Sequence, residues 1–138
     1  MPSYIPDGWQ QTGYIAQGPV SPAGEVAYES MEFTYRPSTR LENIKVDAEI
    51  SLAAKNESDP ESAVKAEKIA CEFIAKKIVS WDLKAVGIHD VAVSADAMGR
   101  MHPTLFNRLY RIIRGADFSD KKPEAETVPT SDGDQLKN

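Results

Sequence analysis

Cysteine and histidine are scarce in this chain, and their scarcity excludes several kinds of chemistry. The 138 residues include one cysteine, Cys71, and two histidines, His89 and His102. A zinc site needs three or four protein ligands at a suitable spacing, and a single cysteine cannot form an internal disulfide. Cys71 lies in an apolar segment and is best interpreted as a core residue. We expect no metal or disulfide framework and a reducing compartment, the cytoplasm.

Recognisable catalytic motifs and long apolar runs are missing as well. The chain has no Gly-x-Ser-x-Gly elbow, no phosphate-binding glycine loop and no dinucleotide fingerprint. No apolar run approaches the roughly 18 to 20 residues of a membrane span. The first nine residues have neither the basic region nor the apolar core of a secretory signal. We therefore expect a non-enzymatic protein with no cofactor, no membrane partner and no secretion.

Positive charge is in deficit, which bears on nucleic-acid binding. The formal net charge is -5, whereas nucleic-acid binders are usually basic. From residue 117 onward there are six acidic and three basic residues, a net charge of -3, which leaves -2 for residues 1–116. The acid is thus concentrated at the C-terminal end. We predict no nucleic-acid partner.

A helix-turn-helix remains the DNA-binding alternative, over residues 94–115. A short helix, a glycine turn and an arginine-bearing second helix would fit that motif. The residues at the start of a recognition helix should reach base edges, but here they are Pro103, Thr104, Leu105 and Phe106. The arginines come later in the helix, where they favour contact with phosphate or protein.

The length of the chain predicts one domain with tails. Residues 1–24 are rich in proline and glycine and predict an extended, poorly packed arm. Residues 25–118 predict a single mainly helical domain of the α+β class, with three to four helices and a short N-terminal β-strand or hairpin. Residues 119–138 have too few apolar side chains to offset the entropy of ordering, so we expect a flexible, acidic and disordered tail.

Alternating side chains predict the strand, and capping residues predict the first helix. The alternation over residues 25–36 indicates one strand, or a hairpin closing onto the arm, with Met31, Phe33 and Tyr35 on the buried face. Thr39 and Glu42 then form a capping box. In the helix that follows, one face is lined by Leu41, Ile44, Ala48 and Leu52, and a second apolar group lies beside it: Val46, Ile50 and Ala53.

The second helix is predicted over residues 60–80, after the cap Asp59 and with Pro60 at its first position. It is the longest and most apolar element, so it should be the central helix of the core. Trp81 follows it. A short extended segment is expected at Ile88, Val91 and Val93, and a short helix from Ser94 to Met98 that Gly99 can stop.

The last predicted helix runs from Pro103 to Arg114, with Gly115 just past its end. Its apolar residues recur at spacings of three and four and share one side. Arg108, Arg111 and Arg114 form a neighbouring stripe. One interpretation is a solvated face whose long side chains cover apolar surface and complement the helix dipole. The other is a docking face for an acidic partner, either a protein or a phosphate backbone.

Several short motifs follow one another in the second half of the chain and in the strand before it. They are Phe33-Thr-Tyr-Arg-Pro37, Ile74-Ala-Lys-Lys-Ile-Val-Ser-Trp-Asp-Leu83, Val91-Ala-Val-Ser94 and Met101-His-Pro-Thr-Leu-Phe-Asn-Arg-Leu-Tyr-Arg-Ile-Ile-Arg-Gly115, with a closing Ser119-Asp120. Motifs in this order resemble tail assembly chaperones of tailed bacteriophages and prophages. The resemblance covers about residues 30–120.

The resemblance implies a mainly helical, non-enzymatic protein of the infected bacterial cytoplasm, which binds the phage tape-measure protein and recruits tail-tube subunits. It implies candidate partner-binding residues on exposed helix faces: Arg108, Tyr110, Arg111 and Arg114, with Trp81 as a possible aromatic anchor or, alternatively, a core residue at a helix end. The alternative function is a minor structural protein of the virion, such as a connector or tail-completion subunit. A homo-oligomer is possible in either case.

Overall fold

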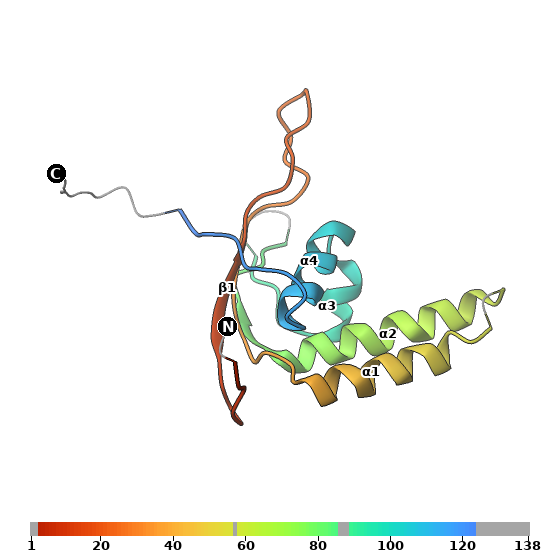
Figure 1. The fold of residues 1–138 in the computed structure, drawn as a ribbon. Helices are drawn as coiled ribbons and strands as arrows, with labels where there is room; N and C mark the ends of the chain where they lie inside the picture. The colour runs from red at the N-terminus through yellow and green to blue at the C-terminus, as the bar shows by residue number, and fades with distance from the viewer. Residues whose placement is uncertain (1–2, 57, 86–88, 124–138) are drawn as a thin grey trace.

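The fold is α+β, as the sequence predicts. It is seen in a computed structural model that describes residues 3–56, 58–85 and 89–123. Within these residues a three-stranded antiparallel sheet of order β1-β2-β3 lies beside four helices (Figure 1). The elements are β1 (Gln11–Ile15), β2 (Met31–Tyr35), α1 (Arg40–Ala53), α2 (Pro60–Lys77), β3 (Ile78–Trp81), α3 (Ala95–Arg100) and α4 (Pro103–Ile113). No helix in these ranges is long and apolar enough to cross a membrane.

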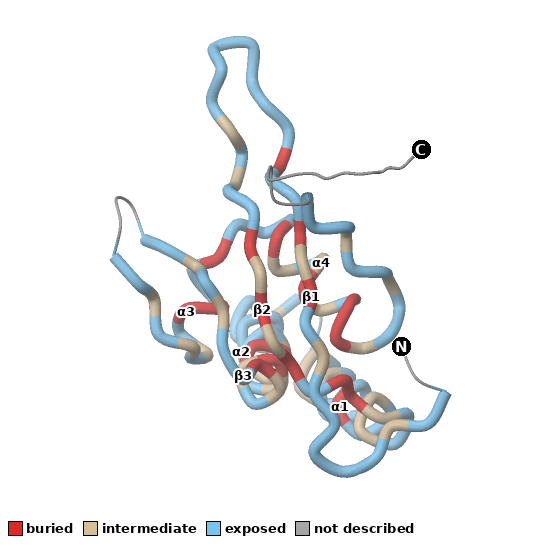
Figure 2. Tube along the Cα trace, turned by 90° about the vertical axis from the view of Figure 1, so that its left-hand side faces the viewer, coloured by how far each residue is buried: buried red, intermediate tan, exposed pale blue. Residues whose placement is uncertain are grey.

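One face of the sheet forms half of the core. Met31, Phe33 and Tyr35 are buried, which confirms the alternation expected for β2, and Ile15 of β1 is fully buried beside them. The second half of α2 with α3 and α4 covers this face, so the structure has two layers. Figure 2 shows buried segments recurring along β1 and β2 and on the helices behind them. The buried core residues are Ile15, Met31, Phe33, Tyr35, Cys71, Ile74, Ile78, Met98, Met101, Leu105, Leu109, Ile112 and Ile113.

The segment that the sequence assigns to a poorly packed arm contains a strand. Residues 11–15 form β1 and pair with residues 31–35 in antiparallel register, with Gly13 opposite Phe33. A Cβ atom on Gly13 would lie 2.6 Å from Cζ of Phe33, so the glycine leaves room for the ring. This corrects the arm prediction for these residues, because the sheet pairing and the burial of Ile15 hold them in the fold.

The predicted helix over residues 60–80 is too long by three residues. It starts as expected, since Asp59 accepts a hydrogen bond from the Glu61 amide and Pro60 is the first helical residue. It ends at Lys77, and residues 78–81 form β3 on the open side of β2. Here β-branched residues and a free strand edge outweigh the helical periodicity of the sequence.

The α-hairpin, which we define as α1 and α2, projects from the body as two adjacent antiparallel helices (Figure 1). The capping box is present: Thr39 Oγ1 accepts a hydrogen bond from the Glu42 amide, and the Glu42 carboxylate accepts one from the Thr39 amide. The inner side of α1 carries Val46, which is buried. Its outer side carries the other apolar group, Leu41, Ile44, Ala48 and Leu52, all of them exposed.

The two short segments before α4 differ slightly from expectation. The extended segment appears as an isolated bridge between Lys84 and Asp90, and Ile88 lies outside the described residues. Ser94 caps α3, but this helix runs through Gly99 to Arg100. The connection to α4 is therefore Met101 and His102 and contains no glycine, unlike the glycine turn considered for a helix-turn-helix.

The beginning of the predicted acidic tail also belongs to the fold. Asp120 donates its backbone N–H to the Tyr14 carbonyl at 2.8 Å, and the Asp120 carboxylate accepts the Ala16 N–H at 2.8 Å. Ser119 Oγ accepts the Tyr14 N–H at 2.7 Å. These bonds satisfy backbone groups on the outer edge of β1, which corrects the prediction of disorder from residue 119. Residues 124–138 of the predicted tail lie outside the described residues.

Candidate functional site

The candidate site is on α4, where the predicted arginine stripe and an apolar groove lie beside each other. His102 caps the helix, with its Nδ1 accepting the Thr104 amide at 3.1 Å, and Gly115 at φ +81° follows its end. Leu105, Leu109, Ile112 and Ile113 are buried against the sheet layer. At 100° per residue, the arginine stripe begins at one border of this buried face and crosses the outer side of the helix.

Arg114 joins α4 to α1. Its guanidinium donates two hydrogen bonds to the Asp47 carboxylate, at 2.8 and 2.7 Å, in a bidentate arrangement. It also donates to Tyr110 Oη at 2.8 Å and to Asn43 Oδ1 at 3.3 Å. The Arg114 side chain is only 17% exposed. Its hydrogen bonds to Asp47 lower the pKa of that carboxyl and raise the pKa of the guanidinium.

Arg108 joins α4 to the segment that covers β1. It donates from Nη1 to Asp120 at 2.8 Å, from Nε to Asp117 at 3.3 Å and from Nη2 to the Phe118 carbonyl at 3.0 Å. The hydrogen bond from Arg108, with that from the Ala16 amide, lowers the pKa of Asp120. Its three donating nitrogens therefore all have partners inside the protein.

Arg111 lies between these two arginines on the helix and is the most exposed of the three. Its side chain is 51% exposed, and its Nη2 donates to the Ala116 carbonyl at 3.2 Å. The stripe thus divides by position. Arg108 and Arg114 connect α4 to other segments, whereas Arg111 is about half exposed and lies 4.0 Å from Asp117, just past the end of the helix.

Trp81 does not lie with the α4 residues. It is at the end of β3 with its Cα opposite that of Phe33, and its Nε1 donates to the Val91 carbonyl at 2.7 Å. The ring is partly buried against the core. The structure therefore gives Trp81 the contacts of a core residue, which was the alternative to an aromatic anchor.

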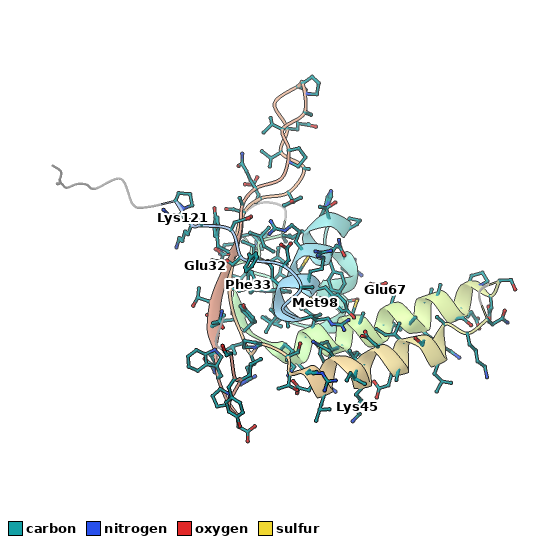
Figure 3. The ribbon with its side chains drawn as sticks, viewed as in Figure 1. Glu32, Phe33, Lys45, Glu67, Met98 and Lys121 are labelled. Carbon is teal, nitrogen blue, oxygen red and sulfur yellow. The ribbon has the colours of Figure 1, made fainter. Side chains whose placement is uncertain are left out.

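A groove of about 520 Å³ runs between the α-hairpin and α4. The rings of Phe106 and Tyr110, with centroids 5.9 Å apart, form its α4 wall. Its charged lining residue is Glu67, which Figure 3 shows on the side of the α-hairpin that faces α3 and α4. The complete lining is Ile50, Ala66, Glu67, Ala70, Pro103, Phe106, Asn107 and Tyr110.

The groove can accept bulky apolar side chains from a partner. Its volume is within the range of about 300–1,000 Å³ that is typical of binding pockets, and aromatic and aliphatic groups dominate its lining. Glu67 and Asn107 add one carboxylate and one amide at its walls. A mostly apolar lining with few polar groups suits the apolar face of an amphipathic helix.

Of the five residues predicted to bind a partner, the structure brings only Tyr110 to the groove. Arg114 touches Tyr110 from the other side, with its guanidinium 5.0 Å from the ring centroid. The acidic partners of the arginines were missed. Asp117 and Asp120 follow Arg108 closely in sequence and could have been proposed, whereas nothing local in the sequence points from Arg114 to Asp47.

The remaining candidates for chemistry in the described ranges are metal-ligating side chains and Cys71. They contain no group of three or more His, Cys, Asp or Glu side chains that could hold a metal ion. Cys71 is buried, and this burial, together with the charges of Glu67 and Glu72, raises the pKa of its thiol. No family model, curated protein or solved structure matches the chain.

Proposed function

We propose that this protein is a non-enzymatic tail assembly chaperone of a tailed bacteriophage or prophage. In this role it binds the tape-measure protein in the cytoplasm of the bacterial host and recruits tail-tube subunits. The sequence resemblance over residues 30–120 supports the phage context. The observation that carries a protein-binding role is the groove between the α-hairpin and α4, which is lined mainly by apolar and aromatic residues.

The client side chains would enter over Phe106 and Tyr110. A tape-measure helix presents apolar residues three and four positions apart, and two such residues fit along a groove of this volume. Aromatic residues in a concave apolar setting are the usual anchors of protein interfaces. In this proposal Tyr110 makes contact with the client, and Arg114 fixes the position of the Tyr110 ring through the bond to Oη.

Glu67 would select the charge of the client. It lines the groove and is exposed, so its carboxylate is available to a lysine or arginine on the bound helix. Arg111, at 51% exposure, offers the opposite charge elsewhere on α4. A client helix with a basic residue next to its apolar anchors is therefore the expected ligand.

Co-expression with the tape-measure protein encoded by the same phage genome tests the proposal. The wild-type chain should keep the client soluble and should copurify with it. Glu67→Lys should weaken copurification, and Asn107→Trp should block the groove with an indole ring. Glu72→Lys is the matched control, because Glu72 is an exposed glutamate of α2 that does not line the groove. If the wild-type chain leaves the solubility of the client unchanged, the chaperone role is refuted.

The same system separates a chaperone from a minor structural protein of the virion. A chaperone acts during assembly and is absent from the finished particle. Mass spectrometry of purified virions should therefore detect the tape-measure protein without stoichiometric amounts of this chain. Stoichiometric presence in the particle would favour the structural protein.

A further inference from the structure

The outer side of α1 exposes an apolar stripe, which we define as Leu41, Ile44, Ala48 and Leu52. The side chains of the three larger residues are 73%, 51% and 70% exposed in that order. Their spacing places all four on one side of the helix. Most exposed leucines in a monomer stand singly. Here four apolar residues share one helix face, so the stripe is a candidate surface for binding a partner.

Two charged residues of α1, Lys45 and Glu49, border the stripe. The charges that face the body are paired: Glu42 lies 2.6 Å from Lys77, and Asp47 binds Arg114. Lys45 and Glu49, by contrast, take part in none of the ion pairs found among residues 3–56, 58–85 and 89–123. At 100° per residue both lie on the same flank of the stripe. Figure 3 shows Lys45 on the side of α1 that points away from α2.

We propose that the stripe binds the same stripe of a second copy of this chain, with the two α1 helices antiparallel about a two-fold axis. In this arrangement Leu41 faces Leu52 of the second copy, and Ile44 faces the small side chain of Ala48. The axis repeats both contacts, so each of them occurs twice in the dimer.

The charges favour this partner over an unrelated helix. Antiparallel helices bring equivalent flanks together, and reversing the chain direction reverses the order of Lys45 and Glu49. Lys45 of each copy therefore lies beside Glu49 of the other, which gives two reciprocal ion pairs. A partner helix with only acidic or only basic residues on this flank would meet one like charge.

The α-hairpin leaves space for such a dimer. It projects from the body with α1 along its outer side (Figure 1). Glu67, in the groove, lies on the opposite side of the hairpin from Lys45 (Figure 3). The pairing therefore leaves the groove open and does not depend on the proposed chaperone role.

Sedimentation equilibrium of the purified full-length chain, from micromolar to millimolar concentration, tests the apolar contact. The average mass should rise with concentration toward that of a dimer. Leu41→Gln with Leu52→Gln should raise the dissociation constant at least about tenfold, because four leucine side chains, which make two contacts, are lost from the dimer interface. Val64→Gln is the control, since Val64 is 53% exposed but lies on α2. A monomeric wild type, or a loss with Val64→Gln equal to that of the stripe variant, would overturn the proposal.

A charge exchange tests the two-fold geometry. Lys45→Glu alone and Glu49→Lys alone should each weaken self-association, because each places two like charges together twice. An equimolar mixture of the two single variants should associate strongly again, since every pair in the mixed dimer has opposite charges. The double variant should also associate as the wild type does. A mixture that associates no better than its components would overturn the antiparallel pairing.

Discussion

Replacing Asp47 by asparagine is expected to lower the free energy of unfolding by about 1 kcal/mol, because the bond between α1 and α4 depends on its charge. The Asp47 carboxylate accepts two hydrogen bonds of 2.7 and 2.8 Å from Arg114. A hydrogen bond to a charged group contributes about 1.5–3 kcal/mol. The carboxylate is 56% exposed, however, so solvent screens the pair. Its contribution to the free energy of unfolding is therefore about 1 kcal/mol, the upper end of the range for surface ion pairs.

Arg114→Met should cost more, about 2 kcal/mol, since it also removes the bonds to Tyr110 Oη and Asn43 Oδ1. Methionine keeps an apolar stem of similar length, which limits the loss of packing. A double-mutant cycle with Asp47→Asn isolates the pair, and the expected coupling is about 1 kcal/mol.

Urea unfolding followed by circular dichroism measures all four proteins of the cycle. Asp96→Asn is the control, because its partner Arg100 lies one helical turn away and both side chains are about 80% exposed. That variant should change stability by no more than about 0.5 kcal/mol. A coupling between Asp47 and Arg114 below about 0.3 kcal/mol would refute the reasoning.

The effect of pH on the Asp47–Arg114 pair follows from the direction of the Asp47 pKa shift. The pKa of Asp47 is lower in the folded protein than in the unfolded chain, where it is about 3.9. Below that value the unfolded chain binds the proton first, so the contribution of the pair is present above the unfolded pKa and is lost as the pH falls through the folded pKa. The stability difference between wild type and Asp47→Asn should therefore shrink below about pH 4.

Further predictions concern the sheet and one helix. Asp120→Asn should weaken the hydrogen bond at the outer edge of β1 and speed amide hydrogen exchange at Ala16, measured by mass spectrometry. Unchanged exchange would show that the carboxylate is dispensable. Gly13→Ala should destabilise by about 1–3 kcal/mol in urea, because its Cβ would overlap the Phe33 ring; a neutral effect would mean that the ring moves freely. Gly99→Ala meets open space inside α3 and should stabilise by about 0.5–1 kcal/mol, so a lower melting temperature would contradict this account.

The sequence predicts the elements that carry their own start and stop signals. These signals are the capping box at Thr39, the Asp59 cap before Pro60, and His102 with Gly115. They mark the starts of α1 and α2 and both ends of α4, because cap geometry depends only on neighbouring residues. The buried alternation of β2 is also a local property. These features could be derived without knowledge of the tertiary structure.

What the sequence could not predict depends on distant partners. Gln11–Ile15 becomes a strand because β2 is available to pair with it, and Ile78 leaves the helical pattern for the other side of β2. On α1 the sequence shows two adjacent apolar groups but not which one packs inward. That choice is fixed by contacts with α2 and by Arg114, 67 residues away from Asp47 in the chain. The groove arises from three helices and has no signature in any one of them.

The hydrogen bonds between residues 119–120 and the outer edge of β1 have a consequence for the order of events during translation. Tyr14 is made early, and its hydrogen-bond partner Ser119 follows 105 residues later. Throughout that interval the outer edge of β1 has no partner within the nascent chain, and an open strand edge is a template for pairing with another chain. The hydrogen bonds on this edge can form only when residues 119 and 120 have left the ribosome. Premature termination just before this point would release a chain that has all of its core residues but lacks the bonds on the outer edge of β1.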